Sequence, residues 1–303
     1  MKVLLVGGLG FIGKRFIRKF SGIHELVVYA KSEDVLKASA TFNLKNVVIE
    51  KGGIEDRRIL EVTVKHKPDV VIHLAALTGL KICHEDPKQA FMTNVYGTFN
   101  VVNACTKSGA KIIFISSREV YGETLYKDSS EDNPLLPNNT YGRTKMIGEQ
   151  IIKLTGQRYN LDYTILRLTN VYGPEGDQYG AQVIIKNALK NSRIQILGGG
   201  QRLNFVYVDD VVDLINLVTS DNRSSKEIFN VGSKDTLTIE EFAGKVIELV
   251  GKKVEINYLP MRETETSNFE PSLKKLEKVL GYLPKTSIID GLQRTIEWYR
   301  NTI

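Results

Sequence analysis

The chain has 303 residues, of which 42% are hydrophobic and 25% are charged, an ordinary composition for a globular protein with a large core. No apolar run approaches the roughly 20 residues of a membrane helix, and the apolar part of MKVLLVGG is too short for a secretory signal, so we expect a cytoplasmic protein. The net charge of +6 suits anionic small molecules. The sequence has no basic block interleaved with aromatic residues, so nucleic-acid binding is not indicated.

The cysteines and histidines form no recognisable ligand set. Cys83 and Cys105 have neither CxxC nor metal-ligand spacing, and the four histidines form no metal motif. We therefore expect two reduced thiols and no metal site. His73 lies within the apolar run VVIHLAAL, which predicts a hydrogen-bonded histidine in the core.

Short β-branched runs alternate with helical stretches through the first two-thirds of the chain. The runs are apolar on both faces, which predicts a parallel sheet buried between two helix layers. Alternating strands and helices with right-handed crossovers indicate a doubly wound α/β fold. We predict strands at residues 2–8, 25–30, 46–50, 69–75, 111–116 and 163–168, and helices at 11–20, 57–66, 91–109 and 141–159.

The pattern changes after about residue 170, where loops become rich in glycine and asparagine. A returning strand is predicted in EIFNVGS, followed by helices at 238–251 and 287–301. We therefore predict a first domain over 1–170, completed by a returning segment near 205–235. Residues 171–204 and 236–303 would form a smaller, mixed α/β lobe.

A glycine-rich turn connects the first predicted strand and helix. Gly7, Gly10 and Gly13 follow the strand VLLV and open the helix, where glycines permit a tight turn, close approach of a pyrophosphate and close helix–sheet packing. The N–H groups at the helix start, including those near Phe11 and Ile12, suit a phosphate anion. The turn therefore predicts a dinucleotide site.

The spacing GxxGxxG differs from the GxGxxG of most dehydrogenases. The segments IHLAAL, NVYGT, ISSREVYGE, YGRTK, RLTNVYGP, FVYVDDVV and LGYLPKTSIIDGLQRTIEWY follow the turn in order. Over nearly the whole chain the sequence resembles the extended short-chain dehydrogenase/reductase branch, the NAD-dependent epimerases and dehydratases of sugar nucleotides. The resemblance implies a Rossmann-like NAD(P)-binding domain and a C-terminal substrate lobe.

Tyr141 and Lys145 lie four residues apart, a spacing that puts both side chains on one face of a helix. The resemblance implies that Tyr141 takes a proton from a sugar hydroxyl, while Lys145 binds the nicotinamide ribose. The ammonium and the positive nicotinamide should lower the pKa of Tyr141 from about 10 towards neutrality. Ser117, at the end of a predicted strand, would hydrogen-bond the same substrate oxygen.

Glu119 allows two interpretations. Dehydratases and decarboxylases of this family often carry glutamate here, so it could act as a second base, or it could form only a local salt bridge. In dehydratases the preceding residue is an acidic aspartate, whereas this chain has Arg118, which cannot donate a proton in that way. We therefore do not expect full 4,6-dehydration.

The adenosine end departs from the family pattern. The aspartate that normally binds the ribose hydroxyls is replaced by Ala30, and Lys31 and Ser32 follow it. The aspartate often found beside adenine is replaced by Gly53. Loss of the acid removes repulsion of a 2′-phosphate, which Lys31 and Ser32 could bind, so NAD and NADP both remain open.

The resemblance implies further contacts. For the cofactor it indicates Ile54, Leu74, Ala75, Ala76 and Asn94, and for the substrate Thr78, Asn170, Arg202 and Arg262. A second arginine expected at the diphosphate is replaced by Leu203, and the sequence does not decide whether Arg202 takes its place.

These features favour a homodimeric epimerase acting at carbon 4 of a UDP-hexose with a recycled NAD or NADP. The alternatives are an NADPH-dependent reductase of 4-keto sugar nucleotides and a UDP-glucuronate decarboxylase. A non-catalytic cofactor-binding protein is a fourth reading, against which the set Ser117, Tyr141 and Lys145 argues. Dimerisation through the helix that carries the pair is implied by the resemblance, and no membrane or nucleic-acid partner is expected.

Overall fold

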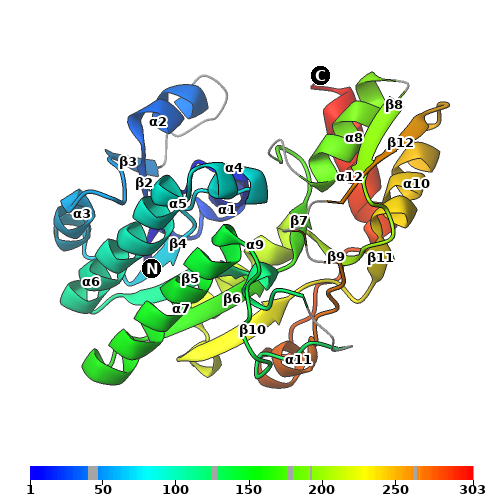
Figure 1. Cartoon of the computed structure of the whole chain (residues 1–303). Coiled ribbons are helices and arrows are strands. Elements are labelled where there is room, and N and C mark those ends of the chain that lie inside the picture. Colours follow the sequence, from blue (N-terminus) through cyan, green and yellow to red (C-terminus); the bar gives the residue numbers. More distant parts are fainter. Residues whose placement is uncertain are drawn as a thin grey trace.

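The computed structural model describes residues 1–39, 47–123, 128–176, 180–191, 193–261, 265 and 267–302. A large parallel sheet with helices on both faces forms one part, and a smaller lobe with short strands and three helices forms the other (Figure 1). No helix in these described ranges is long and apolar enough to cross a membrane.

The main sheet has seven parallel strands in the order β10-β6-β5-β4-β1-β2-β3. Every strand predicted in the first two-thirds of the chain is present, and the predicted doubly wound α/β fold is confirmed. The returning strand β10 pairs with β6 at the sheet edge (Figure 1). The strands are β1 (Lys2–Val6), β2 (Glu25–Ala30), β3 (Val47–Lys51), β4 (Val70–His73), β5 (Lys111–Ser117), β6 (Tyr163–Leu168) and β10 (Glu227–Val231).

Alternate side chains of these strands enter two separate cores. Val3 and Leu5 of β1 pack under one helix layer, whereas Leu4 and Val6 pack under the other, as the two-residue period of a strand requires. The first layer includes α1 (Phe11–Phe20), α9 (Val208–Ser220) and α11 (Lys274–Leu280). The second layer includes α3 (Arg58–His66), α6 (Thr98–Ser108) and α7 (Thr140–Tyr159).

The single helix predicted over 91–109 is wrong in detail. The structure contains α5 (Pro87–Phe91), a π-helical turn η1 (Met92–Gly97) and then α6. A Cβ on Gly97 would lie 2.6 Å from Ile54 Cδ1, so the helix passes this loop at close range. π-helical turns inside helices are frequent at functional sites, and this one borders the cavity described below.

The smaller lobe surrounds a third core made mainly by α8, α10 and α12 against short strands. β11 and β7 flank β9, while β12 pairs with β8. The bounds are β7 (Asn170–Tyr172), α8 (Ala181–Lys190), β8 (Arg193–Leu197), β9 (Arg202–Tyr207), β11 (Thr236–Thr238), α10 (Ile239–Val250), β12 (Glu255–Leu259) and α12 (Ile288–Arg300). The remaining elements are α2 (Ser32–Ser39), α4 (Leu80–Glu85), η2 (Arg118–Val120) and η3 (Asn222–Ser224).

Candidate active site

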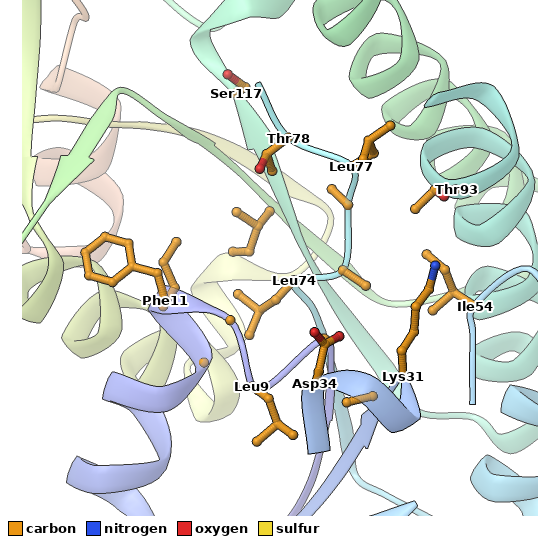
Figure 2. A pocket seen from close by; sticks show the side chains of 18 of the residues that line it. Leu9, Phe11, Lys31, Asp34, Ile54, Leu74, Leu77, Thr78, Thr93 and Ser117 are labelled. Carbon is orange, nitrogen blue, oxygen red and sulfur yellow. The ribbon is translucent and has the colours of Figure 1, made fainter. Parts of the chain in front are cut away.

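A cavity of about 930 Å³ lies at the carboxyl ends of the parallel strands. The strand order reverses between β1 and β4, and ligands of open α/β sheets bind at such a switch point. The cavity extends from the glycine-rich turn at Leu9 and Phe11 to Ser117 (Figure 2). Tyr141 also lines it. The predicted site residues that line it are Gly7, Gly10, Phe11, Ile12, Gly13, Lys31, Ile54, Leu74, Ala75, Ala76, Thr78, Ser117, Tyr141 and Lys145.

The glycine-rich turn fits a pyrophosphate. Gly7 has a φ of +78°, which strongly favours glycine, and a Cβ on Gly13 would lie 2.3 Å from the Gly8 carbonyl oxygen. Gly10 precedes α1 without any side-chain cap, so the first N–H groups of the helix stay available for an anion. These features fit the phosphates of a dinucleotide.

Asn139 and Gly142 place Tyr141 at the start of α7. The Asn139 side chain caps the helix by accepting a hydrogen bond from the Gly142 N–H at 2.8 Å. A Cβ on Gly142 would lie 2.2 Å from the Glu119 carbonyl oxygen, so only glycine lets the helix approach the end of β5 this closely. Tyr141 is thereby brought to Ser117, with which it shares a hydrogen bond.

The electrostatics of the pair differ from the expectation. Burial raises the pKa of Tyr141, and the negative charge of Glu119 raises it further, while the hydrogen bond with Ser117 lowers it. In the chain alone this pKa is thus raised and not lowered, and the expected lowering, which includes the positive nicotinamide, stays a prediction for the protein with its cofactor. Burial also lowers the pKa of Lys145, to about 8; its ammonium donates to the Ile115 carbonyl at 2.8 Å and lies 5.9 Å from the Tyr141 ring centre.

Asn94 contacts the cavity wall through Leu77, which lines the cavity. It is buried and is not among the described lining residues. Its side chain accepts from the Leu77 N–H at 2.8 Å, donates to the Leu77 carbonyl at 3.0 Å and donates to Thr144 Oγ1 at 3.0 Å. Asn94 therefore ties the loop after β4 to α7.

Glu119 lies in a buried ion pair. Its Oε1 is 2.8 Å from Nη2 of Arg118, and its Oε2 accepts from the Asn139 side chain at 2.7 Å. Both carboxylate oxygens thus have partners, and Glu119 is not among the described residues that line the cavity. The local salt bridge, one of its two interpretations, is present.

The residues predicted for the substrate divide into three groups. Thr78 and Ser117 line the cavity. The Asn170 side chain donates to the Asn204 carbonyl at 2.9 Å, and exposed Arg202 donates to the Thr236 carbonyl at 3.2 Å; neither is among the described lining residues. Leu203 points into the core of the smaller lobe, and Arg262 lies outside the described residues.

Sequence reasoning missed several residues of the cavity. Asp34 and Thr93 line it, whereas the predicted Ser32 is exposed and is not in the described lining. Asp34 lies only four residues beyond Ala30, the end of the strand, and this short distance could have indicated a carboxylate at the adenosine end of the site. In the described part of the chain no group of His, Cys, Asp or Glu residues is arranged to hold a metal ion.

A buried polar network behind the site was also missed. Arg167 of β6 pairs with Glu149 of α7 at 2.7 Å and donates to the Tyr121 hydroxyl at 2.7 Å, and the Ser116 hydroxyl donates to Glu149 at 2.5 Å. This network fastens the helix that carries Tyr141 to the sheet. The signal was an arginine in the otherwise apolar strand YTILRL.

A sheet of this topology, with a glycine-rich turn and a Ser–Tyr–Lys set at one cavity, is typical of short-chain dehydrogenases/reductases. The profile of the NAD dependent epimerase/dehydratase family matches residues 3–232, and the chain belongs to that family. Members of the family are enzymes that act on sugar nucleotides.

Similar proteins cover the chain end to end. A provisionally named UDP-glucose 4-epimerase of Methanocaldococcus jannaschii is 32% identical over 99% of this chain and 98% of its own. A UDP-N-acetyl-alpha-D-glucosaminuronate decarboxylase of Bacillus cytotoxicus is 30% identical, with coverage of 99% and 98%. The structure of UDP-glucose 4-epimerase from Thermus thermophilus, a complex with NAD, matches with a TM-score of 0.90 at 27% identity and covers both chains fully.

Proposed function

We propose that the protein is a sugar-nucleotide epimerase that inverts carbon 4 of a UDP-hexose and recycles a bound NAD. The observation that carries the proposal is one continuous cavity with the glycine-rich turn at one end and Ser117, Tyr141 and Lys145 at the other. The names of the epimerases of M. jannaschii and T. thermophilus, and the NAD in the latter complex, support it.

The dinucleotide, when bound, would supply the hydride chemistry: it would accept a hydride from carbon 4 of the sugar and return it to the opposite face of that carbon. Tyr141 would take the proton of the sugar hydroxyl and later return it, as a general base and then a general acid. Ser117 would hold the sugar oxygen through its hydroxyl. Because the chain's own groups raise the pKa of Tyr141, a phenolate requires an added positive charge, which the oxidised nicotinamide carries.

Lys145 would orient the nicotinamide ribose and stabilise the negative charge on Tyr141. Its Nζ has one hydrogen bond to the Ile115 carbonyl, and an ammonium has three donors. Asn94 would support this geometry by joining the loop after β4 to α7.

Decarboxylation is the second candidate, because the B. cytotoxicus relative carries that name. Glu119 is the residue that sequence reasoning offered in support of this reaction. The buried pair with Arg118 and the bond from Asn139 occupy its carboxylate. Epimerisation needs no second base and accords better with this arrangement.

We also propose a homodimer formed through α6 and α7, which pack against each other. Phe99 on α6 and Leu154 on α7 are 51% and 65% exposed. Large apolar side chains on neighbouring helices suit a two-fold helical interface. This arrangement agrees with the dimer implied by the family resemblance.

The test is incubation of the purified protein with UDP-glucose, UDP-galactose or UDP-glucuronate, without added cofactor, followed by proton NMR. The proposal predicts an equilibrium mixture of the two hexoses from either one. Release of carbon dioxide from UDP-glucuronate without hexose interconversion would identify a decarboxylase instead. In a parallel incubation with NADPH and a 4-keto sugar nucleotide, consumption of NADPH without hexose interconversion in the first assay would identify a reductase.

A further inference from the structure

The cavity has a charged corner at the end of β2, lined by Ala30, Lys31 and Asp34, and Glu55 contacts Lys31 there without being among the described lining residues. Ala30 ends β2 and supplies no acid, but Lys31 and Asp34 both line the cavity. Figure 2 shows the two side chains rising from the start of α2 into the cavity, with the Asp34 carboxylate uppermost on its side chain. The corner therefore presents a carboxylate although the strand end has none.

The ammonium of Lys31 has a partner in this corner. Lys31 Nζ lies 3.4 Å from Glu55 Oε1. The same carboxylate accepts from Thr93 Oγ1 at 2.6 Å and from Gln89 Nε2 at 3.4 Å. Burial alone would raise the pKa of Glu55, but the bonds from Thr93 and Lys31 outweigh it and leave that pKa below its ordinary value, so Glu55 is ionised and compensates the charge of Lys31.

Gly53 makes room for the Glu55 carboxylate. A Cβ on Gly53 would lie 2.7 Å from Glu55 Oε2 and 3.8 Å from the Lys31 Cε. The carboxylate of Glu55, two residues further along the chain, thus occupies the space that a side chain at residue 53 would need. The Asn100 side chain holds this loop by donating to the Ile54 carbonyl at 3.0 Å and the Glu55 carbonyl at 3.2 Å.

We propose that this corner selects NAD over NADP, with Asp34 accepting hydrogen bonds from the adenosine ribose hydroxyls and Glu55 holding Lys31 away from a 2′-phosphate. The inference rests on the proposed function, because it takes the cavity to bind a nicotinamide dinucleotide. A carboxylate accepts hydroxyl hydrogen bonds strongly, and like charge placed against a phosphate rejects it. Lys31 alone would favour NADP, but its ion pair with Glu55 and the carboxylate of Asp34 favour NAD instead.

The test is calorimetric titration of nucleotide-free protein with NAD and with NADP, for the native chain and for single variants. The native protein should bind NAD at least about 10-fold more tightly than NADP. Asp34→Asn should weaken NAD binding about 10-fold, since one charge-assisted hydrogen bond is weakened, and should strengthen NADP binding. Glu33→Gln, the same loss of charge at the exposed neighbouring residue of α2, should change neither affinity.

Glu55→Gln separates the two parts of the corner. It should raise the affinity for NADP by releasing Lys31, and a further Lys31→Gln change should cancel that gain. The inference is overturned if the native protein prefers NADP, if Asp34→Asn behaves like Glu33→Gln, or if Lys31→Gln alone removes substantial NADP affinity. Binding of neither dinucleotide would overturn the proposed function itself, and the inference with it.

Discussion

Tyr141 is the residue on which the proposed chemistry depends. Burial and nearby negative charge keep its hydroxyl protonated in the chain alone, and the hydrogen bond with Ser117 opposes them. In the proposed mechanism a reactive phenolate therefore needs the positive charge of the oxidised nicotinamide in addition to that of Lys145, which would couple proton transfer to the presence of oxidised cofactor.

Replacement of Tyr141 by Phe should lower kcat for hexose interconversion roughly 10²–10⁴-fold, the usual contribution of a general acid–base group. NAD affinity and the unfolding midpoint should stay within error, because the ring remains in place. Steady-state kinetics and calorimetry on the same preparation measure both. Retention of more than about a tenth of the native kcat, against that range, would remove Tyr141 from the reaction.

His73 gives a prediction for stability against pH. Burial lowers its pKa from 6.5 to about 3, and its Nε2 hydrogen-bonds the buried Thr98 hydroxyl at 2.9 Å. The folded protein keeps this imidazole neutral, whereas the unfolded chain takes up a proton below about pH 6.5. Stability from this group is thus present at neutral pH and is lost as the pH falls from 6.5 towards 3.

Between about pH 7.5 and 5 this linkage should remove about 2 kcal/mol of unfolding free energy, at about 1.4 kcal/mol per fully titrated pH unit. A His73→Asn variant should lack that increment, although it is less stable at neutral pH. Urea unfolding of both proteins at the two pH values gives the comparison. Equal losses in both proteins would show that His73 does not carry the effect.

At the scale of elements, the buried ion pair between α7 and β6 ties the helix that carries Tyr141 to the main sheet. Arg167 and Glu149 side chains are 2% and 1% exposed, and removing one partner of a buried pair leaves an uncompensated charge. Glu149→Gln should therefore lower the unfolding free energy by about 3–5 kcal/mol and also lower kcat, because α7 carries Tyr141.

Glu255→Gln is the matched control. It breaks the pair between Arg193 and Glu255, whose side chains are 65% and 66% exposed, and exposed pairs contribute less than about 1 kcal/mol. Urea unfolding monitored by circular dichroism compares the two variants. Similar small losses in both would mean that the buried network does not hold α7 in place.

The main sheet could be predicted because each of its strands is a short β-branched run between helical segments, and two buried faces remove any need for polar alternation. The smaller lobe was harder to predict, since β7 and β11 have three residues each and are too short to show a hydrophobic periodicity. The π-helical turn occurs together with tertiary contacts of Asn94 with Leu77 and of Gly97 with Ile54. Such contacts leave no local pattern in the sequence.

The candidate site was predictable where its residues follow a motif. The glycines, Ser117, Tyr141 and Lys145 come together as expected. Asp34 was missed because its place in the cavity depends on how α2 leaves β2. Lys31 was read without its partner, because Glu55 lies 24 residues further along the chain.

For the whole molecule, the proposed dimer interface on α6 and α7 can be tested through the oligomeric state of variants. A Leu154→Glu or Phe99→Glu change would place a charge in the interface and should produce a monomer by light scattering. Leu36→Glu is the control, since Leu36 on α2 is 70% exposed and lies away from those helices (Figure 1). A native protein with the mass of one chain would contradict the dimer.

In the proposed epimerisation, hydride leaves carbon 4 and returns to it within one enzyme molecule. The most direct measurement uses UDP-galactose with deuterium at carbon 4, incubated with the purified protein without added dinucleotide, and follows the product by NMR. The proposed mechanism predicts UDP-glucose that retains the deuterium at carbon 4. Product that has lost the label, or no conversion at all, would contradict it.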